Sequence, residues 1–134
     1  MASQLKVDTL TGVTTAGSIS VTGEGNSTTT NLQQGLAKAW IRYDGTSPGS
    51  GADSLNIASI TDSGTGDQRP VMTNAMASEN YAPVSTSAQY HELLGNAGGS
   101  TGTTTTTFKI ETRDSGNSAA DTGRVACAVH GDLA

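Results

Sequence analysis

Polar and apolar residues alternate along several short stretches of this chain, and a period of two is typical of half-buried β-strands. The clearest stretch is Arg124–His130, in which the apolar residues Val125, Cys127 and Val129 share one face. Similar patterns predict further strands over 40–43, 55–60, 69–73, 81–85 and 103–112.

Turn-forming residues separate these stretches. Gly, Ser, Asp, Asn and Pro cluster over 46–51, 62–67 and 96–102. Strands that recur about every dozen residues with turns between them are typical of sandwiches and barrels. The pattern therefore predicts an all-β fold, with a jelly-roll-like β-sandwich over residues 40–134.

The segment 31–39 is the best candidate for a helix. Asn31 can cap its N-terminus, and Leu32 and Leu36 lie four residues apart, so they share one face. Gly35 weakens a helix, and a single turn of linker is the alternative interpretation. A single apolar stripe suits a small bundle between chains, so Leu32 and Leu36 are candidate contacts of an oligomer.

Residues 1–30 are predicted to form an extended or short-stranded arm. Their apolar residues are too widely spaced to fold alone, yet the composition is not that of a disordered segment. We therefore expect the arm to order on a partner surface through Leu5, Val7, Leu10, Ile19 and Val21. The sequence thus divides into an arm over 1–30, a short helix or linker over 31–39, and the sandwich over 40–134.

Composition and charge argue against several classes of partner. The 134 residues carry a net charge of −5. An acidic chain gains nothing from counterion release, so nucleic acid is not an expected partner. No apolar run reaches the roughly 20 residues of a transmembrane helix, so membrane insertion is not expected. The N-terminus lacks the layout of a signal peptide, which predicts synthesis in a cytosol without export by that route.

The apolar content is low for a domain that builds its own core. Hydrophobic residues make up 34% of the chain and aromatic residues 4%, both below the usual share. The single cysteine, Cys127, excludes an internal disulfide framework. Because no covalent staple replaces the missing apolar area, we expect the chain to complete its core by oligomerisation.

Several segments together resemble a known family. They are 5–10, 31–40, 59–67, 73–77 and 125–132, and the most specific is the run Leu-Gln-Gln-Gly-Leu-Ala-Lys-Ala-Trp within the second. The combination is similar to that of the small fibre-like virion proteins of tailed bacteriophages, especially tail fibre proteins from phages of marine bacteria and cyanobacteria. The resemblance implies a homotrimeric, all-β structural protein, whose N-terminal arm attaches to the particle while the sandwich projects outward.

No catalytic, cofactor-binding or metal-binding residues are predicted. His91 and His130 are the only histidines, and a metal site needs three or four ligands. An ion on the axis of a trimer, held by three copies of one histidine, is the alternative. Cys127 alternates with valines, which favours a buried thiol over a nucleophile. A glycan depolymerase would need a carboxylate pair that the sequence does not offer, so we expect a protein that is not an enzyme.

Two regions are candidates for contact with other molecules. Trp40 is the single tryptophan. A carbohydrate-stacking platform is one interpretation of it, but core or trimer interface, together with Leu32 and Leu36, is favoured. Residues 84–104 are expected to form a receptor-contact loop through Gln89, Tyr90 and His91.

The expected function is therefore structural. The chain is interpreted as a trimeric tail fibre or spike component, made in the bacterial host cytoplasm and assembled on the virion. Its expected partners are other phage virion proteins of the tail, baseplate or capsid, and a host surface glycan or protein. The alternative is a capsid decoration protein, or head fibre, that cements or caps the shell.

Overall fold

The computed structural model describes residues 4–13, 19–22, 29–49, 53–89, 91–94 and 102–133, with the backbone alone at 33–34 and 91–94. The chain divides into two compact units, Met1–Leu36 and Ala37–Ala134. The second unit begins with a strand at Ala37, upstream of Trp40, where the sequence placed the start of the sandwich.

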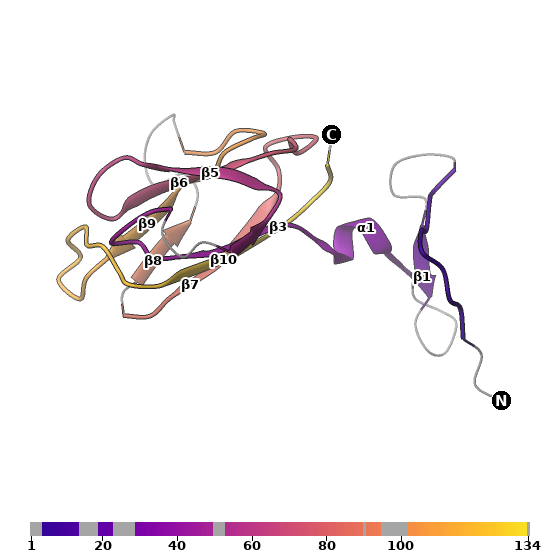
Figure 1. The fold of residues 1–134 in the computed structure, drawn as a ribbon, viewed down its shortest axis with the longest axis horizontal. Helices are drawn as coiled ribbons and strands as arrows, with labels where there is room; N and C mark the ends of the chain where they lie inside the picture. The colour runs from indigo at the N-terminus through magenta and orange to yellow at the C-terminus, as the bar shows by residue number, and fades with distance from the viewer. Residues whose placement is uncertain are drawn as a thin grey trace. The chain divides into compact units, whose positions relative to one another are not determined.

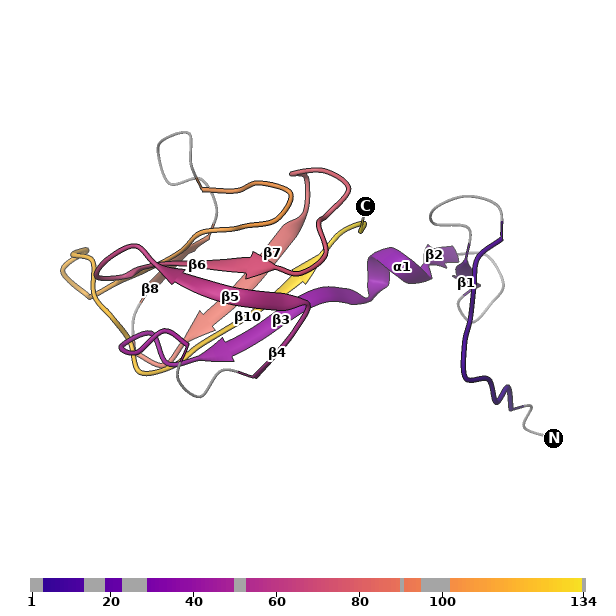
Figure 2. The same cartoon turned by 45° about the horizontal axis from the view of Figure 1, so that its top comes forward.

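The second unit is a β-sandwich of two four-stranded antiparallel sheets, which Figures 1 and 2 show as two layers. The first sheet has the order β4-β3-β10-β7 and consists of β3 (Ala37–Tyr43), β4 (Asp53–Leu55), β7 (Ala82–Ser87) and β10 (Val125–His130). The second has the order β5-β6-β9-β8 and consists of β5 (Ile57–Asp62), β6 (Asp67–Met72), β8 (His91–Leu94) and β9 (Ile110–Arg113).

This order confirms an all-β sandwich but not the jelly-roll pairing. A jelly roll of eight strands pairs the second strand with the seventh, which here would join β4 to β9. Instead β4 pairs with β3, and β9 lies between β6 and β8. The reason is local, because β3 and β4 are consecutive strands and consecutive strands commonly pair with each other.

The core lies between the two sheets and belongs to one chain. The predicted alternation in β10 is confirmed, since Val125, Cys127 and Val129 are buried while their neighbours are partly exposed. Buried residues of the neighbouring strand β3 lie beside them in the same sheet, and Met72, Phe108 and Ile110 close the core from the other side. All members of this apolar cluster lie within Ala37–Ala134.

Two predicted strands are shorter or broken in the structure. The strand expected over 55–60 is interrupted at Asn56, which has a positive φ of 57° and separates β4 from β5. The strand expected over 103–112 is confined to β9 at its C-terminal end. Upstream of β9 the hydroxyl of Thr104 accepts hydrogen bonds from the backbone N–H groups of Thr106 and Thr107, at 3.2 and 3.0 Å. Such a side-chain bond stabilises a turn at the expense of a strand.

The first unit contains a two-stranded antiparallel sheet and one turn of helix. β1 (Ser20–Thr22) pairs with β2 (Thr29–Asn31), and α1 (Leu32–Gly35) follows directly. The helix predicted over 31–39 is therefore too long. Ala39 is instead buried in β3, opposite Val129 of β10, because strand pairing in the sandwich overrides the helix propensity of this alanine-rich segment.

Candidate functional site

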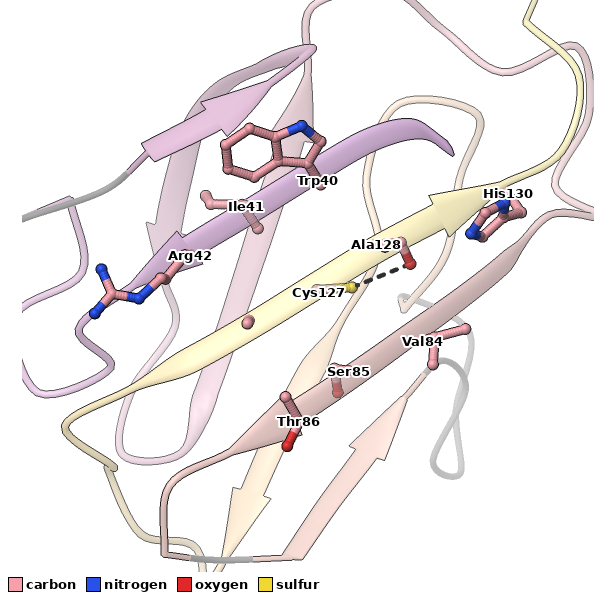
Figure 3. A pocket seen from close by; sticks show the side chains of 10 residues that line it. Trp40, Ile41, Arg42, Val84, Ser85, Thr86, Cys127, Ala128 and His130 are labelled. Carbon is pink, nitrogen blue, oxygen red and sulfur yellow. Dashed lines mark hydrogen bonds between the residues drawn. The ribbon is translucent and has the colours of Figure 1, made fainter. Parts of the chain in front are cut away.

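The outer face of the first sheet carries an open trough of about 600 Å³, which Figure 3 shows from close by. Three strands line it, and we call it the Trp40 trough. Its lining residues are Trp40, Ile41 and Arg42 of β3, Val84, Ser85 and Thr86 of β7, and Ala126, Cys127, Ala128 and His130 of β10.

The register of the strands explains the shape of the trough. Across the sheet, Leu55, Trp40, Ala128 and Val84 lie directly opposite one another on adjacent strands. Side chains that alternate with buried neighbours point away from the core, so this row faces outward. Alanine is small and its row neighbours on both sides are large, so Ala128 forms a floor with Trp40 and Val84 as walls.

The next outward row is polar at both ends. It contains Asp53, Arg42, Ala126 and Thr86 in register. Within the described part of the chain, Arg42 forms no ion pair although Asp53 is its neighbour across the strands. The trough thus combines an apolar floor with an exposed guanidinium.

The outer face of the second sheet has a different electrostatic arrangement. Its charged side chains form a continuous chain of ion pairs in the order Arg69, Asp67, Lys109, Glu111 and Arg113. The Lys109 Nζ lies 3.2 Å from Asp67 Oδ2 and 2.9 Å from Glu111 Oε2. Opposite charges are therefore neutralised locally among these five side chains.

These contacts shift the pKa values of the charged groups. The hydrogen bond from Lys109 lowers the pKa of Glu111 below its ordinary value of 4.5. The same bond raises the pKa of Lys109 above 10.5. Burial raises the pKa of Asp67, but hydrogen bonds from Arg69 and Lys109 outweigh it and hold the pKa below 3.8. All of these groups are therefore ionised at neutral pH.

The residues that the sequence proposed as a trimer interface belong to two different units, Leu32 and Leu36 to the first and Trp40 to the second. Trp40 is not a core residue, since it lies between buried Ala39 and Ile41 on β3 and so faces the trough. Leu32 is partly buried in α1, whereas Leu36 follows the end of the helix and is 53% exposed. The shared helical face predicted for the two leucines does not form, because the helix ends at Gly35.

The predicted receptor loop over 84–104 is in part β-structure. It includes most of β7 and all of β8. Gln89 is exposed in a bend, and Tyr90 lies outside the described residues. His91 is the first residue of β8, paired with Arg113, so it belongs to a strand and not to a loop.

The predicted attachment residues are mostly exposed within the first unit. Leu5 is 80% exposed, and Val7, Leu10 and Val21 are each at least half exposed. Ile19 is partly buried. Val13, which the sequence does not single out, is a further exposed apolar residue of this unit, at 93%.

Sequence reasoning also missed Arg42, Ala126 and Ala128 of the trough. The alternation of each strand indicates which residues point outward, but only the strand order shows which outward residues meet. Among the described residues, no group of three histidine, cysteine or acidic side chains is placed to hold a metal ion. In the same part of the chain, no helix is long and apolar enough to cross a membrane.

No protein-family model, curated protein or solved structure matches this chain.

Proposed function

We propose that this chain is a structural virion protein of a tailed bacteriophage, a homotrimeric tail fibre or spike component. Its first unit attaches to the particle, and its sandwich is presented to the host. The proposal rests on the family resemblance of the sequence and on the contrast between the two units. The chain has no catalytic step in this role.

The observation that carries the proposal is the exposure of large apolar side chains in the first unit. Leu5, Val7, Leu10 and Val13 are all more than half exposed. Leaving such side chains in water forfeits about 1.5–3 kcal/mol for each that could be buried. Exposed apolar side chains that follow one another closely in the sequence suit a surface that a partner covers. The partners here are other virion proteins and, at Leu36, the neighbouring copies of the chain.

The sandwich supports the second half of the proposal. It contains its own buried core, so it can be displayed on the particle without structural help from its mount. Sandwiches of this kind vary in their surface residues without loss of the core, which suits recognition of a host.

The test is incorporation into particles. We expect a chain without Met1–Leu36 to fold but to be missing from purified virions, whereas a chain with Val84→Ser is incorporated at normal copy number. A gold label at the C-terminus then locates the protein on the tail or on the capsid shell. Normal incorporation of the truncated chain would contradict the proposed role of the first unit.

The oligomeric state is tested separately by light scattering on the purified chain. We expect the mass of a trimer. A stable monomer at micromolar concentration would contradict the trimeric assembly.

A further inference from the structure

Several hydrogen-bonding groups surround the Trp40 trough. The indole N–H of Trp40, the hydroxyl of Thr86 and the imidazole of His130 form no hydrogen bond within the described part of the chain. They surround a floor of alanine side chains. An apolar floor with a few polar groups at its rim is the usual composition of a small-molecule site, and about 600 Å³ lies within the usual range of volumes.

The positive charge of Arg42 at the trough indicates that the ligand carries a negative charge. Arg42 is exposed, follows Trp40 by two residues on the same face of β3, and has no ion pair in the described residues. Arg69 and Arg113 on the other sheet both pair with carboxylates. The guanidinium of Arg42, beside the single tryptophan Trp40, favours an anionic ligand.

We propose that the Trp40 trough binds an acidic saccharide, with one pyranose ring stacked on the indole of Trp40 and its carboxylate paired with the guanidinium of Arg42. This proposal adds a ligand class to the sandwich that the proposed function presents to the host. It rests on the proposed function only for the claim that the saccharide lies on a host surface. Binding itself is a property of the isolated chain.

The chemistry of a sugar matches both parts of the trough. One face of a pyranose ring carries mainly C–H groups, which pack on the flat apolar face of an indole. Its rim carries hydroxyl groups, which suit Thr86 and His130. Figure 3 shows Trp40 and Arg42 on β3, with Thr86 and Val84 across the trough on β7. A guanidinium binds a carboxylate through two parallel hydrogen bonds, which adds orientation as well as affinity.

The single tryptophan makes the experiment direct. All indole fluorescence of the chain comes from Trp40, so a ligand in the trough changes the emission of the reporter itself. The full-length chain is titrated with oligogalacturonate and, separately, with maltooligosaccharide of the same length. We expect a saturable change with the acidic oligosaccharide, at least about tenfold tighter than with the neutral one, the ratio that one charge-assisted hydrogen bond supplies.

Variants separate the two contacts. Arg42→Gln is expected to remove the preference for the acidic oligosaccharide, while Lys6→Gln, which removes one exposed charge from the first unit, leaves it unchanged. Trp40→Ala has no indole fluorescence, so its binding of the acidic oligosaccharide is measured by calorimetry. We expect binding at least about tenfold weaker, as loss of an aromatic stack produces. Light scattering on each variant checks that its mass is unchanged.

Three results would overturn the inference: no fluorescence change with the acidic oligosaccharide, equal affinity for both oligosaccharides, or a loss of oligomeric mass in Trp40→Ala. The last would show that a second copy of the chain covers the trough. None of these results affects particle incorporation through the first unit, so a failure here is distinct from a failure of the proposed function.

Discussion

Gly66, at the turn that leads into β6, has a φ of +68°, a conformation that residues with a Cβ rarely adopt. Its N–H donates to Asp121 Oδ1 at 2.7 Å, and its carbonyl accepts from the N–H of Thr112 at 2.9 Å. A Cβ at this position would collide with the carbonyl oxygen of Thr112 and lie 2.9 Å from the amide nitrogen of Ala120. The backbone atoms of Thr112 and Ala120 therefore leave no room for a side chain at Gly66.

We expect Gly66→Ala to lower the free energy of unfolding by about 3 kcal/mol, from backbone strain together with the collision. Gly123→Ala is the matched control, because a Cβ there meets no atom within 4 Å. Urea unfolding of both variants measures the difference. Equal midpoints for the two variants would show that the turn at Gly66 adapts to a side chain.

Asn56 joins the two sheets at the point where the chain crosses from β4 to β5. Its Oδ1 accepts from the backbone N–H of Asn74 at 2.8 Å, and its Nδ2 donates to the carbonyl oxygens of Lys38 at 3.1 Å and Asn74 at 3.2 Å. Its positive φ is one that asparagine tolerates better than most residues. Both the backbone conformation and the amide group therefore stabilise this crossing.

Two substitutions separate these contributions. Asn56→Gly keeps the backbone conformation and loses the amide, whereas Asn56→Ala loses the amide and adds the strain of a positive φ. We expect Asn56→Gly to cost about 2 kcal/mol for the lost hydrogen bonds, and Asn56→Ala about 1 kcal/mol more. Thermal unfolding measures both, and an alanine variant as stable as the glycine variant would count against backbone strain at Asn56.

At the scale of elements, the ion pairs across β6 and β9 make the stability of the second sheet depend on pH. The pKa values of Glu111 and Asp67 are lowered on folding, so their contribution is fully present above their ordinary values of 4.5 and 3.8. It is lost as the pH falls through the lower pKa values of the folded state. The folded protein is thus expected to lose stability below about pH 4.5.

We expect Glu111→Gln to flatten this acid dependence, because the variant has no carboxylate to protonate at that position. Glu79→Gln removes an exposed carboxylate outside the ion-pair chain and serves as the control. Urea unfolding between about pH 3 and pH 7 measures the free energy of unfolding as a function of pH. This range brackets the ordinary pKa values of carboxylates. Parallel profiles for Glu111→Gln and the unaltered chain would exclude these ion pairs as the cause.

The elements also show what sequence patterns can predict. β10 was predicted because Val125, Cys127 and Val129 alternate over its whole length, and alternation is a local property. The local pattern over 37–39 predicts a helix, but the segment forms a strand. Its strand pairing with β10 depends on residues far along the chain, which a local pattern does not contain. The same holds for the Trp40 trough. Leu55, Trp40, Ala128 and Val84 become neighbours only through the order of the strands, which no local pattern contains.

At the scale of the whole molecule, the two units differ in what stabilises them. The apolar cluster lies entirely within Ala37–Ala134. The first unit has a two-stranded sheet, and an isolated two-stranded sheet is at best marginally stable in water. The proposed role of the first unit, in which a partner surface covers its exposed leucines and valines, fits this difference.

The consequence is testable on the truncated chain. We expect residues 37–134 alone to unfold cooperatively, with a thermal midpoint within a few degrees of the full-length chain, because the core is unchanged. We also expect the mass to fall from that of a trimer to that of a monomer, since Leu32 and Leu36 are removed with the first unit. Calorimetry and light scattering on the same sample measure both properties. A truncated chain that remains trimeric would move the chain–chain contact onto the sandwich, where the exposed Leu55 and Val84 beside Trp40 would be the first residues to substitute.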